Sequence, residues 1–529
     1  MKWVVLHEKN NRIVLTSVSD DSSVSGGLLP SGSFITVVNS ITNSNDERKF
    51  VLRVEESEQI ALFNPSPLLA DLSIDIQEAD RECKNKVIAY RIHDISSRED
   101  GLVDFIKPQS IARLSNSEEI NLALEANKNR GVNVFPSTVY SSKSQKLFDS
   151  SKSPIKVQLP EDIFWHQIQI SGKTGSGKTV ATKYLANSFA NTKTKVKSGK
   201  EFYGAVLAIN VKDTDFLHLE KPTRIINPEI LSEWNSLNIK PEGNTNFEIL
   251  YSAHEDLDSY TAQEVNPDLC TPITLKAKDL KPESLLGVVE NLTELAQQQL
   301  PDIFRYWQQT SSDDATFNDF LSHFDTCMEN DYNFQVISLS NRESTRKLNP
   351  STANAMKGRL ETASSFFENQ NGNDLKVEEL IKEGKTTVIE IGQSMDFGSI
   401  VLRYILNKII EIKRTSEIPV LIIIDEVHQF YSNNSSKAAL ADLDLICRTG
   451  RSKQIGVIFS SQNINDIPSG LSSVINSKFI FKTDEFNKKI NGIKPEDIMA
   501  MNSGYCVAHI HGMPQLRTLK FPMSTNGVI

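Results

Sequence analysis

The segment GKTGSGKT, residues 172–179, matches the pattern G-x-x-x-x-G-K-[ST] at every fixed position. It follows the apolar run IQIS and opens a helix-forming run, which is the context that a phosphate-binding loop requires. Its glycines allow a nest of inward-pointing N–H groups, and the helix adds the positive end of its dipole. We expect Lys178 to reach the β- and γ-phosphates of ATP and the Thr179 hydroxyl group to ligate Mg²⁺. The residues predicted to bind the nucleotide are Gly172, Lys173, Thr174, Gly175, Ser176, Gly177, Lys178 and Thr179.

A second candidate pair, Asp425 and Glu426, directly follows the apolar run PVLIII. Such a run predicts a buried strand whose end lies at the carboxyl edge of a parallel sheet, where α/β folds bind their ligands. We expect Asp425 to hold Mg²⁺ through water, and Glu426 to orient and polarise the attacking water as a general base. An apolar strand that ends in Asp-Glu is often only structural, but here it follows a complete phosphate-binding loop, which favours the catalytic interpretation.

The third element, CRTGRSKQIGVIFSSQN, contains Arg448, Arg451 and Gln462. Gln462 ends a predicted strand beside the phosphate-binding strand, so it is a candidate sensor of the γ-phosphate. Arg448, at a predicted helix end, and Arg451, in a predicted Gly-containing turn, are candidate arginine fingers that stabilise charge on the transferred group. Surface arginines and a solvent-facing glutamine explain the same pattern, and the sequence alone favours neither interpretation.

Strands and helices alternate from about residue 155, which is typical of a parallel sheet covered by helices. Between the second and third strands lies a long, mostly helical insertion, and the end of the chain is again rich in β-forming residues. The predicted strands are 168–171, 205–211, 386–391, 420–424 and 456–461, and the predicted helices are 178–190, 397–413 and 438–448.

The first hundred or so residues contain short β-forming runs separated by Gly-, Ser-, Asn- and Asp-rich turns. This pattern predicts a small barrel or sandwich. A polar, mixed segment follows and is expected to be a linker. The predicted units are an N-terminal β-barrel (1–110), a linker (111–154), a first core part (155–254), a helical insertion (255–365) and a second core part with a β tail (366–529).

The chain has 529 residues and a net charge of −10, so it is too long for one domain and is not a general binder of polyanions. Contact with nucleic acid would need a local basic surface. The most basic run, KTKVKSGK at 193–200, is interpreted as a solvated loop. Five widely spaced cysteines fit a reducing cytoplasm, and we expect no signal peptide and no membrane span.

Three histidines outside these motifs were considered as further site residues. His166, before the phosphate-binding strand, is interpreted as a packing residue. His509 and His511 alternate on the predicted tail strand, but the sequence offers no apparent third ligand, so no metal site is predicted there.

Together, the three motifs resemble the HerA-like branch of the HerA/FtsK superfamily of P-loop translocases. HQIQISGKTGSGKT is similar to its histidine–strand–loop signature, IIIDEVHQF to its Asp-Glu-x-His strand end, and RTGRSKQIGVIFSSQN to its Arg-x-Gly-Arg turn and Ser-Gln strand end. The chain departs from the family pattern after the second strand, where NVKDTDFLHLE lacks a Gly-Glu-Tyr segment, and after Gln462, where Asn463 and Ile464 replace Arg-Pro.

The resemblance implies an α/β fold: a RecA-like P-loop ATPase core with an N-terminal small β-barrel and a helical insertion. It implies a homo-hexameric ring that hydrolyses ATP, threads double-stranded DNA through a central pore, and docks a nuclease or other effector on its barrel. DNA end processing and anti-phage defence are the implied settings. One subunit would supply Lys178, Thr179, Asp425 and Glu426, and its neighbour an arginine.

An alternative function is an ATPase scaffold that oligomerises and regulates a bound effector nuclease with little DNA movement. The negative net charge and the changed segment after Gln462 favour this alternative. A protein-threading ATPase is not supported, because the chain shows no aromatic-hydrophobic-Gly pore loop.

Overall fold

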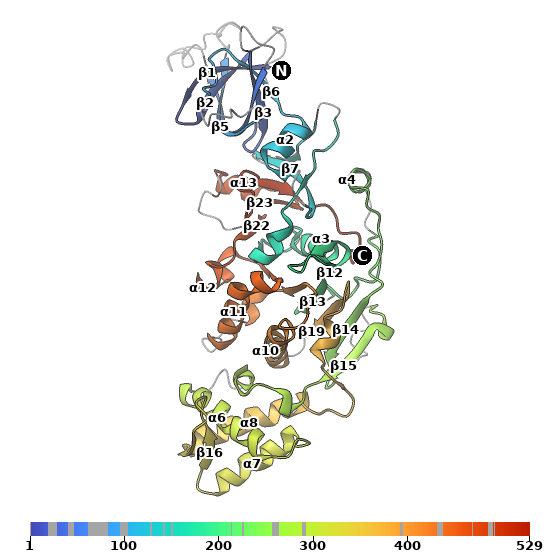
Figure 1. The fold of residues 1–529 in the computed structure, drawn as a ribbon, viewed down its shortest axis with the longest axis vertical. Helices are drawn as coiled ribbons and strands as arrows, with labels where there is room; N and C mark the ends of the chain where they lie inside the picture. The colour runs from blue at the N-terminus through green and yellow to red at the C-terminus, as the bar shows by residue number, and fades with distance from the viewer. Residues whose placement is uncertain are drawn as a thin grey trace, which may run out of the picture.

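The structure is a computed structural model. The residues that it describes are 2–18, 29–40, 47–61, 83–95, 104–126, 130–140, 143–149, 152–212, 214–224, 227–255, 264–287, 293–391, 395–430, 437–467, 469–484, 490 and 492–529. A barrel, a large sheet with its helices, and a helical lobe follow one another along the long axis of the molecule (Figure 1).

The N-terminal barrel is closed, with the antiparallel strand order β1-β2-β5-β4-β3-β6. Alternate residues of its strands point inward; on β1, for example, Trp3 and Val5 are buried whereas Leu6 is exposed. The predicted small barrel is therefore confirmed. Its strands are β1 (Lys2–Lys9), β2 (Arg12–Val18), β3 (Phe34–Ser40), β4 (Glu47–Ala61), β5 (Cys83–Asp94) and β6 (Ile111–Leu114).

The segment 111–154, expected to be a linker, is folded in its described parts. β6 closes the barrel, α2 (Ser117–Ala123) begins with a capping box, and β7 (Asn133–Tyr140) and β8 (Lys143–Lys146) belong to the large sheet. The linker prediction is wrong because β6 and β7 pair with distant parts of the chain, which their local composition does not reveal. β7 pairs with a strand near the end of the chain, so no local pattern announces the pairing.

The large sheet has the order β18-β15-β14-β19-β13-β20-β21-β10-β22-β23-β24-β7-β8. From β15 to β22, neighbouring strands are parallel, and β23 and β24 continue the sheet antiparallel. The central strands are β10 (Ile168–Ser171), β13 (Ala205–Asn210), β19 (Thr386–Glu390), β20 (Val420–Ile424), β21 (Ile455–Ser461) and β22 (Ser477–Phe481). All five strands predicted for the core are present, because their buried apolar runs suit a sheet covered on both faces.

Helices cover both faces of this sheet. Val206 and Ala208 of β13 pack in the same cluster as helix α3 (Lys178–Asn191). Leu207 and Ile209 point to the other face and pack in the cluster of α10 (Met395–Ile412) and α11 (Lys437–Lys453). The phosphate-binding strand and its helix are thus fixed between two hydrophobic layers.

The remaining elements complete the sheet and the connections between its strands. The basic run 193–200, expected to be a loop, instead forms part of a β-hairpin of β11 and β12. These remaining elements are β9 (Val157–Gln158), β11 (Lys193–Lys195), β12 (Glu201–Tyr203), α4 (Pro228–Leu237), β14 (Phe247–Ser252), β15 (Cys270–Thr274), β18 (Asn373–Asp374), α9 (Val377–Leu380), α12 (Ser469–Ser472), α13 (Pro495–Met499), β23 (Tyr505–His509) and β24 (Thr518–Lys520).

The helical lobe lies at the end of the molecule opposite the barrel (Figure 1). It contains α6 (Glu294–Thr310), α7 (Phe317–Glu329), α8 (Pro350–Ala363) and the hairpin of β16 (Asn333–Ile337) and β17 (Glu343–Lys347). Phe304, Phe320 and Phe324 are fully buried among these elements and hold them together through aromatic contacts.

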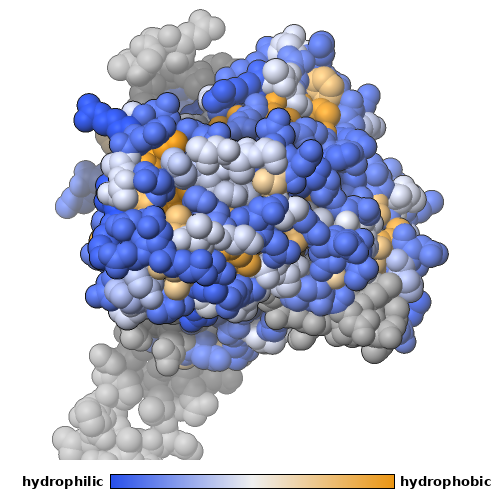
Figure 2. Space-filling view, turned by 90° about the horizontal axis from the view of Figure 1, so that it is seen from below, coloured by the Kyte–Doolittle hydropathy of each residue, from blue (hydrophilic) through white to orange (hydrophobic). Residues whose placement is uncertain are grey.

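Figure 2 views the molecule from the lower end of Figure 1. This face is mostly hydrophilic, with only small, scattered hydrophobic areas. Within the described residues, no helix combines the length and the apolar content that crossing a membrane requires.

Candidate functional site

The predicted phosphate-binding loop joins β10 to α3, and two of its glycines are required by its shape. Gly172 and Gly177 have φ values of 151° and 100°, which disfavour any side chain. A Cβ on Gly172 would lie 2.7 Å from Cβ of Phe481, and one on Gly177 would lie 2.8 Å from N of Gly504. The glycines therefore serve both the loop conformation and its close packing.

Segments from the end of the chain hold the loop in place. The Gly504 N–H donates to the Ser176 carbonyl at 2.9 Å, and the Lys173 N–H donates to the Lys482 carbonyl at 2.8 Å. The Ser503 hydroxyl adds a bond to the loop at 3.1 Å. This support comes from residues more than 300 positions downstream, and no motif in the sequence predicts it.

Lys178 and Thr179, on the first turn of α3, point into the site. The Lys178 ammonium group is buried and donates to the carbonyl oxygens of Gly172 and, at 3.2 Å, Lys173. Burial lowers the pKa of Lys178, and the negative charges of Glu426 and Asp425 oppose that shift. The Thr179 hydroxyl donates to Oδ2 of Asp215 at 3.4 Å, so the predicted Mg²⁺ ligand lies beside a carboxylate.

Asp425 and Glu426 follow β20 at the same carboxyl edge, and both are 4% exposed. Burial, reinforced by the charge of Glu426, raises the pKa of Asp425 to about 6. Oδ2 of Asp425 is buried without a hydrogen-bond partner. Oxygen atoms of carboxylates and hydroxyls are the ligands that Mg²⁺ prefers, so Asp425, with Thr179 and Asp215 near the same loop, suits this ion.

Gln462 also lies at this edge. Its amide Nε2 donates to Oε1 of Glu426 at 3.2 Å, and its side chain is otherwise exposed. The amide therefore connects the end of β21 to the predicted general base, which is the geometry that a sensor of the bound nucleotide needs. Whether it senses the γ-phosphate stays a prediction.

Two basic side chains, His428 and Lys212, also lie beside Glu426. Nδ1 of His428 lies 3.4 Å from Oε2 of Glu426 and 3.9 Å from Oδ2 of Asp466. Nζ of Lys212 lies 4.0 Å from Oε1 of Glu426. The signal for His428 was its position two residues after Glu426 in the same motif.

Arg448 and Arg451 lie elsewhere in the subunit. They are on the last turns of α11, before the start of β21, whereas the phosphate-binding loop lies beyond the end of that strand. β21 has seven residues, and at about 3.3 Å per residue it separates the two edges by roughly 20 Å. Arg448 is exposed and paired with Asp444 at 2.6 Å. Neither arginine reaches the nucleotide site of its own subunit.

The turn predicted around Arg451 is wrong, because α11 continues through Gly450 to Lys453. Gly450 is needed for close packing: a Cβ there would lie 2.5 Å from the carbonyl oxygen of Ile455. A helical glycine that serves packing has the same sequence signal as a glycine that breaks a helix.

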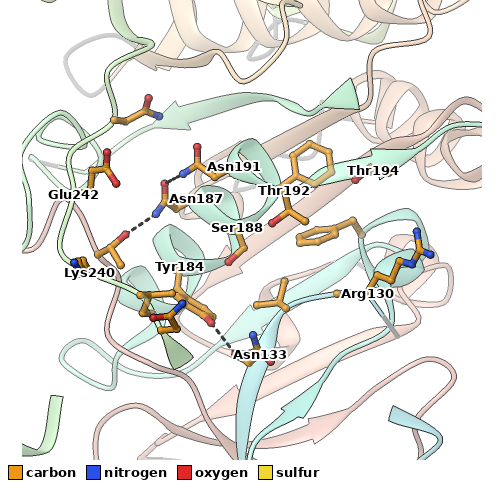
Figure 3. A pocket seen from close by; sticks show the side chains of 18 of the residues that line it. Arg130, Asn133, Tyr184, Asn187, Ser188, Asn191, Thr192, Thr194, Lys240 and Glu242 are labelled. Carbon is orange, nitrogen blue, oxygen red and sulfur yellow. Dashed lines mark hydrogen bonds between the residues drawn. The ribbon is translucent and has the colours of Figure 1, made fainter. Parts of the chain in front are cut away.

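One pocket among the described residues is separate from the predicted site residues. It has a volume of about 680 Å³ and lies along the carboxyl-terminal part of α3, lined by Tyr184, Asn187 and Asn191 among others (Figure 3). Many of its polar groups bond one another, such as Asn191 Nδ2 to Asn187 Oδ1 at 2.7 Å and the Tyr184 hydroxyl to the Asn133 carbonyl at 2.8 Å. We assign it no ligand.

Comparison with known families gives one match, to the model described as the central domain of helicase HerA. It covers residues 145–412, just over half of the chain. This region contains the phosphate-binding loop and α10, and it ends just before β20. No curated protein matches the chain.

Solved structures give remote similarities. The unbound bacterial conjugative coupling protein TrwB, without its first 70 residues, is 12% identical with a TM-score of 0.44, over 79% of this chain and 93% of that chain. VirB4 of Thermoanaerobacter pseudethanolicus is 12% identical with a TM-score of 0.43, over 74% of this chain and 97% of that chain. TrwB has also been solved with ADP and Mg²⁺, in a structure 14% identical to this chain over 67% of it, with a TM-score of 0.40.

Proposed function

This chain belongs to the HerA family of P-loop ATPases, and we propose that it binds ATP with Mg²⁺ at residues 172–179 and uses hydrolysis to move double-stranded DNA. One observation carries the ATPase part of the proposal. Lys178 comes from one motif and the adjacent Asp425 and Glu426 from another, about 250 residues later, yet their charges act on one another at a single edge of the sheet.

In this mechanism Lys178 exchanges its bonds to loop carbonyls for bonds to the β- and γ-phosphates. Thr179 and Asp425, with Asp215 nearby, would hold Mg²⁺, which would neutralise phosphate charge when bound. Glu426 accepts the proton of the attacking water, because its buried carboxylate is the base next to the loop. Gln462 touches that carboxylate, so it can report the state of the γ-phosphate to the end of β21.

The assembly part of the proposal is a homo-hexameric ring in the cytoplasm. Arg448 and Arg451 are too far from the nucleotide site of their own subunit, which supports a role in the site of a neighbour. DNA would pass through a basic central pore, and a nuclease-type effector would dock on the N-terminal barrel, in DNA end processing or anti-phage defence.

The second candidate function is an ATPase scaffold that regulates a bound effector nuclease and moves little DNA. The net charge of −10 favours it, because a surface of that sign repels phosphate backbones outside a local basic patch.

One experiment separates the two functions: the ATPase rate with and without linear duplex DNA, over a salt series from about 50 to 200 mM. Translocation through phosphate contacts predicts stimulation that falls steeply as salt rises, since each contact releases counterions. A DNA-independent rate at every salt concentration contradicts translocation and supports the scaffold. Glu426→Gln serves as the control for contaminating ATPases.

A further inference from the structure

Three side chains with metal-binding atoms meet at the amino edge of the parallel strands, which is the edge opposite the nucleotide site. Asp162 and His166 are on the 3₁₀ helix η3 (Glu161–His166), and His511 follows β23. One ligand atom from each residue lies within 4.8 Å of the others. The sequence suggested pairing His511 with His509 and offered no third ligand; the fold brings it to His166 and Asp162 instead.

The contacts within this cluster leave one polar atom unexplained. Nε2 of His166 is buried and has no hydrogen-bond partner. It lies 3.6 Å from Oδ2 of Asp162, which is too long for a hydrogen bond but spans two ligands of one ion. Burying a polar nitrogen without a partner costs free energy, and a bound ion removes that cost.

We propose that Asp162, His166 and His511 bind a divalent transition metal ion of the Zn²⁺ type, with water as the fourth ligand. Two imidazoles and one carboxylate form a donor set that suits Zn²⁺ and leaves one position open. The rings of His166 and His511 are stacked, with centroids 3.5 Å apart and planes at 27°, so binding requires the His511 ring to turn. His511 is half-buried and lies in a turn, whereas His166 is buried.

Residues outside the ligand set, Asn476 and Ser477, contact His166 and His511. Nδ2 of Asn476 lies 3.4 Å from Nδ1 of His166, and the Asn476 backbone N–H donates to the His166 carbonyl at 2.9 Å. The backbone N–H of His511 donates to the Ser477 hydroxyl at 3.2 Å. A metal ion on Nε2 of His166 requires Nδ1 to carry the proton and donate it, so the Asn476 amide would turn its oxygen towards Nδ1 when the ion binds.

The charges near the cluster bear on its affinity. Burial is the main cause of the lowered pKa of His166, and the charge of Arg451 adds to it; Arg451 therefore repels a cation at this site, whereas Asp162 attracts one. Asp162 is thus the only one of the three proposed ligands whose negative charge offsets the charge of a bound cation. A bound ion would tie η3, which leads into β10, to the turn that follows β23.

The test titrates Zn²⁺ into the untagged full chain by calorimetry, without nucleotide, and records the visible absorption of Co²⁺ as a second readout. Both are done in an Asp425→Asn background, which weakens the candidate Mg²⁺ site that Asp425 forms with Thr179 and Asp215. We expect one bound Zn²⁺, a Co²⁺ band of a four-coordinate site, and affinity at least ~10-fold lower in His511→Ala and in Asp162→Ala.

The matched control is His509→Ala, an exposed histidine on β23 two residues from His511, which should leave the Zn²⁺ affinity and the Co²⁺ band unchanged. His511 and Asp162 are half-buried, so their variants test the site with less risk to folding than a change of His166. No binding in the Asp425→Asn chain, or equal affinity in His511→Ala, Asp162→Ala and His509→Ala, overturns the proposal.

Discussion

Asp425 and Glu426 are adjacent in the chain, but their neighbours give them different properties. Glu426 contacts the Gln462 amide and lies near the basic groups of His428 and Lys212. Asp425 has less compensation for its burial, so its pKa is raised to about 6. Glu426 is therefore the candidate to act on water, and Asp425 is the candidate to bind a cation.

We predict that Glu426→Gln binds ATP normally but hydrolyses it at least ~10²-fold more slowly. The amide keeps the shape of the side chain but cannot accept a proton, and general-base catalysis contributes about 10² to 10⁴ in rate. Single-turnover phosphate release measures this, with Glu118→Gln, an exposed change on α2, as the matched control. Normal turnover in Glu426→Gln would remove this residue from the mechanism.

We predict that Lys178→Ala loses most of its ATP affinity, because its ammonium group is the main side-chain partner expected for the β- and γ-phosphates. Calorimetric titration with ATP and Mg²⁺ checks this. Lys193→Ala, an exposed lysine on β11, is the control for the loss of one positive charge. Unchanged binding in Lys178→Ala would contradict the phosphate-binding role of the loop.

The raised pKa of Asp425 predicts a pH dependence. Its folded-state pKa of about 6 lies above the ordinary value of 3.8, so the folded state binds the proton more tightly. Stability of the nucleotide-free protein is therefore lost as pH rises from about 4 to 6, and ionised Asp425 is destabilising above pH 6.

Asp425→Asn should accordingly raise Tm at pH 8, raise it much less at pH 5, and abolish Mg²⁺-dependent hydrolysis. Thermal melts at both pH values measure the stability change. An equal or lower Tm for the variant at pH 8 would show that burial of this charge is not costly.

At the scale of elements, the sequence predicts the strands and helices whose signals lie in neighbouring residues of the chain. The strands before Gly172 and Asp425 are continuous buried runs, each followed by residues typical of a nucleotide site. Their presence as strands, and their ends at the carboxyl edge of the sheet, could therefore be predicted from the sequence pattern. β7 could not be predicted, because its partner β24 lies some 380 residues away. The contacts of His428 with Asp466 and of Asp215 with Thr179 depend likewise on the fold, although His428 belongs to the same motif as Glu426 and Asp215 follows the second predicted strand.

Gly450 gives a prediction that separates helix packing from helix propensity. Gly450→Ala should lower the free energy of unfolding by about 1–3 kcal/mol, because its Cβ would meet backbone that cannot move aside. Gly358→Ala, at an exposed position in α8 with open space around it, should instead stabilise by about 0.5–1 kcal/mol. Denaturant unfolding of both variants checks the pair. A stabilising Gly450→Ala would show that α11 does not pack this closely on β21.

At the scale of the whole molecule, the candidate site residues lie at two opposite edges of the sheet. The nucleotide residues lie at the carboxyl edge of the parallel strands, while Arg448 and Arg451 lie at the amino edge of β21, roughly 20 Å away. If an arginine of the amino edge acts in the site of a neighbour, each subunit carries one part of a shared catalytic site on each edge. A ring would bring the arginine edge of one copy to the nucleotide edge of the next.

This layout leads to a mixing experiment with two inactive variants. If an arginine acts across a subunit boundary, combining Glu426→Gln subunits with Arg451→Ala subunits should restore hydrolysis, because some boundaries then pair an intact glutamate with an intact arginine. Arginine fingers supplied by a neighbour contribute about 10³ to 10⁵ in rate, so even partial restoration is measurable. Arg451→Ala is the first choice, because Arg448 is already paired with Asp444 and can serve its own helix end. The same mixture with Arg448→Ala identifies which arginine acts. Wild-type rates in both arginine variants, or full activity in a monomer confirmed by sedimentation, would contradict a shared site.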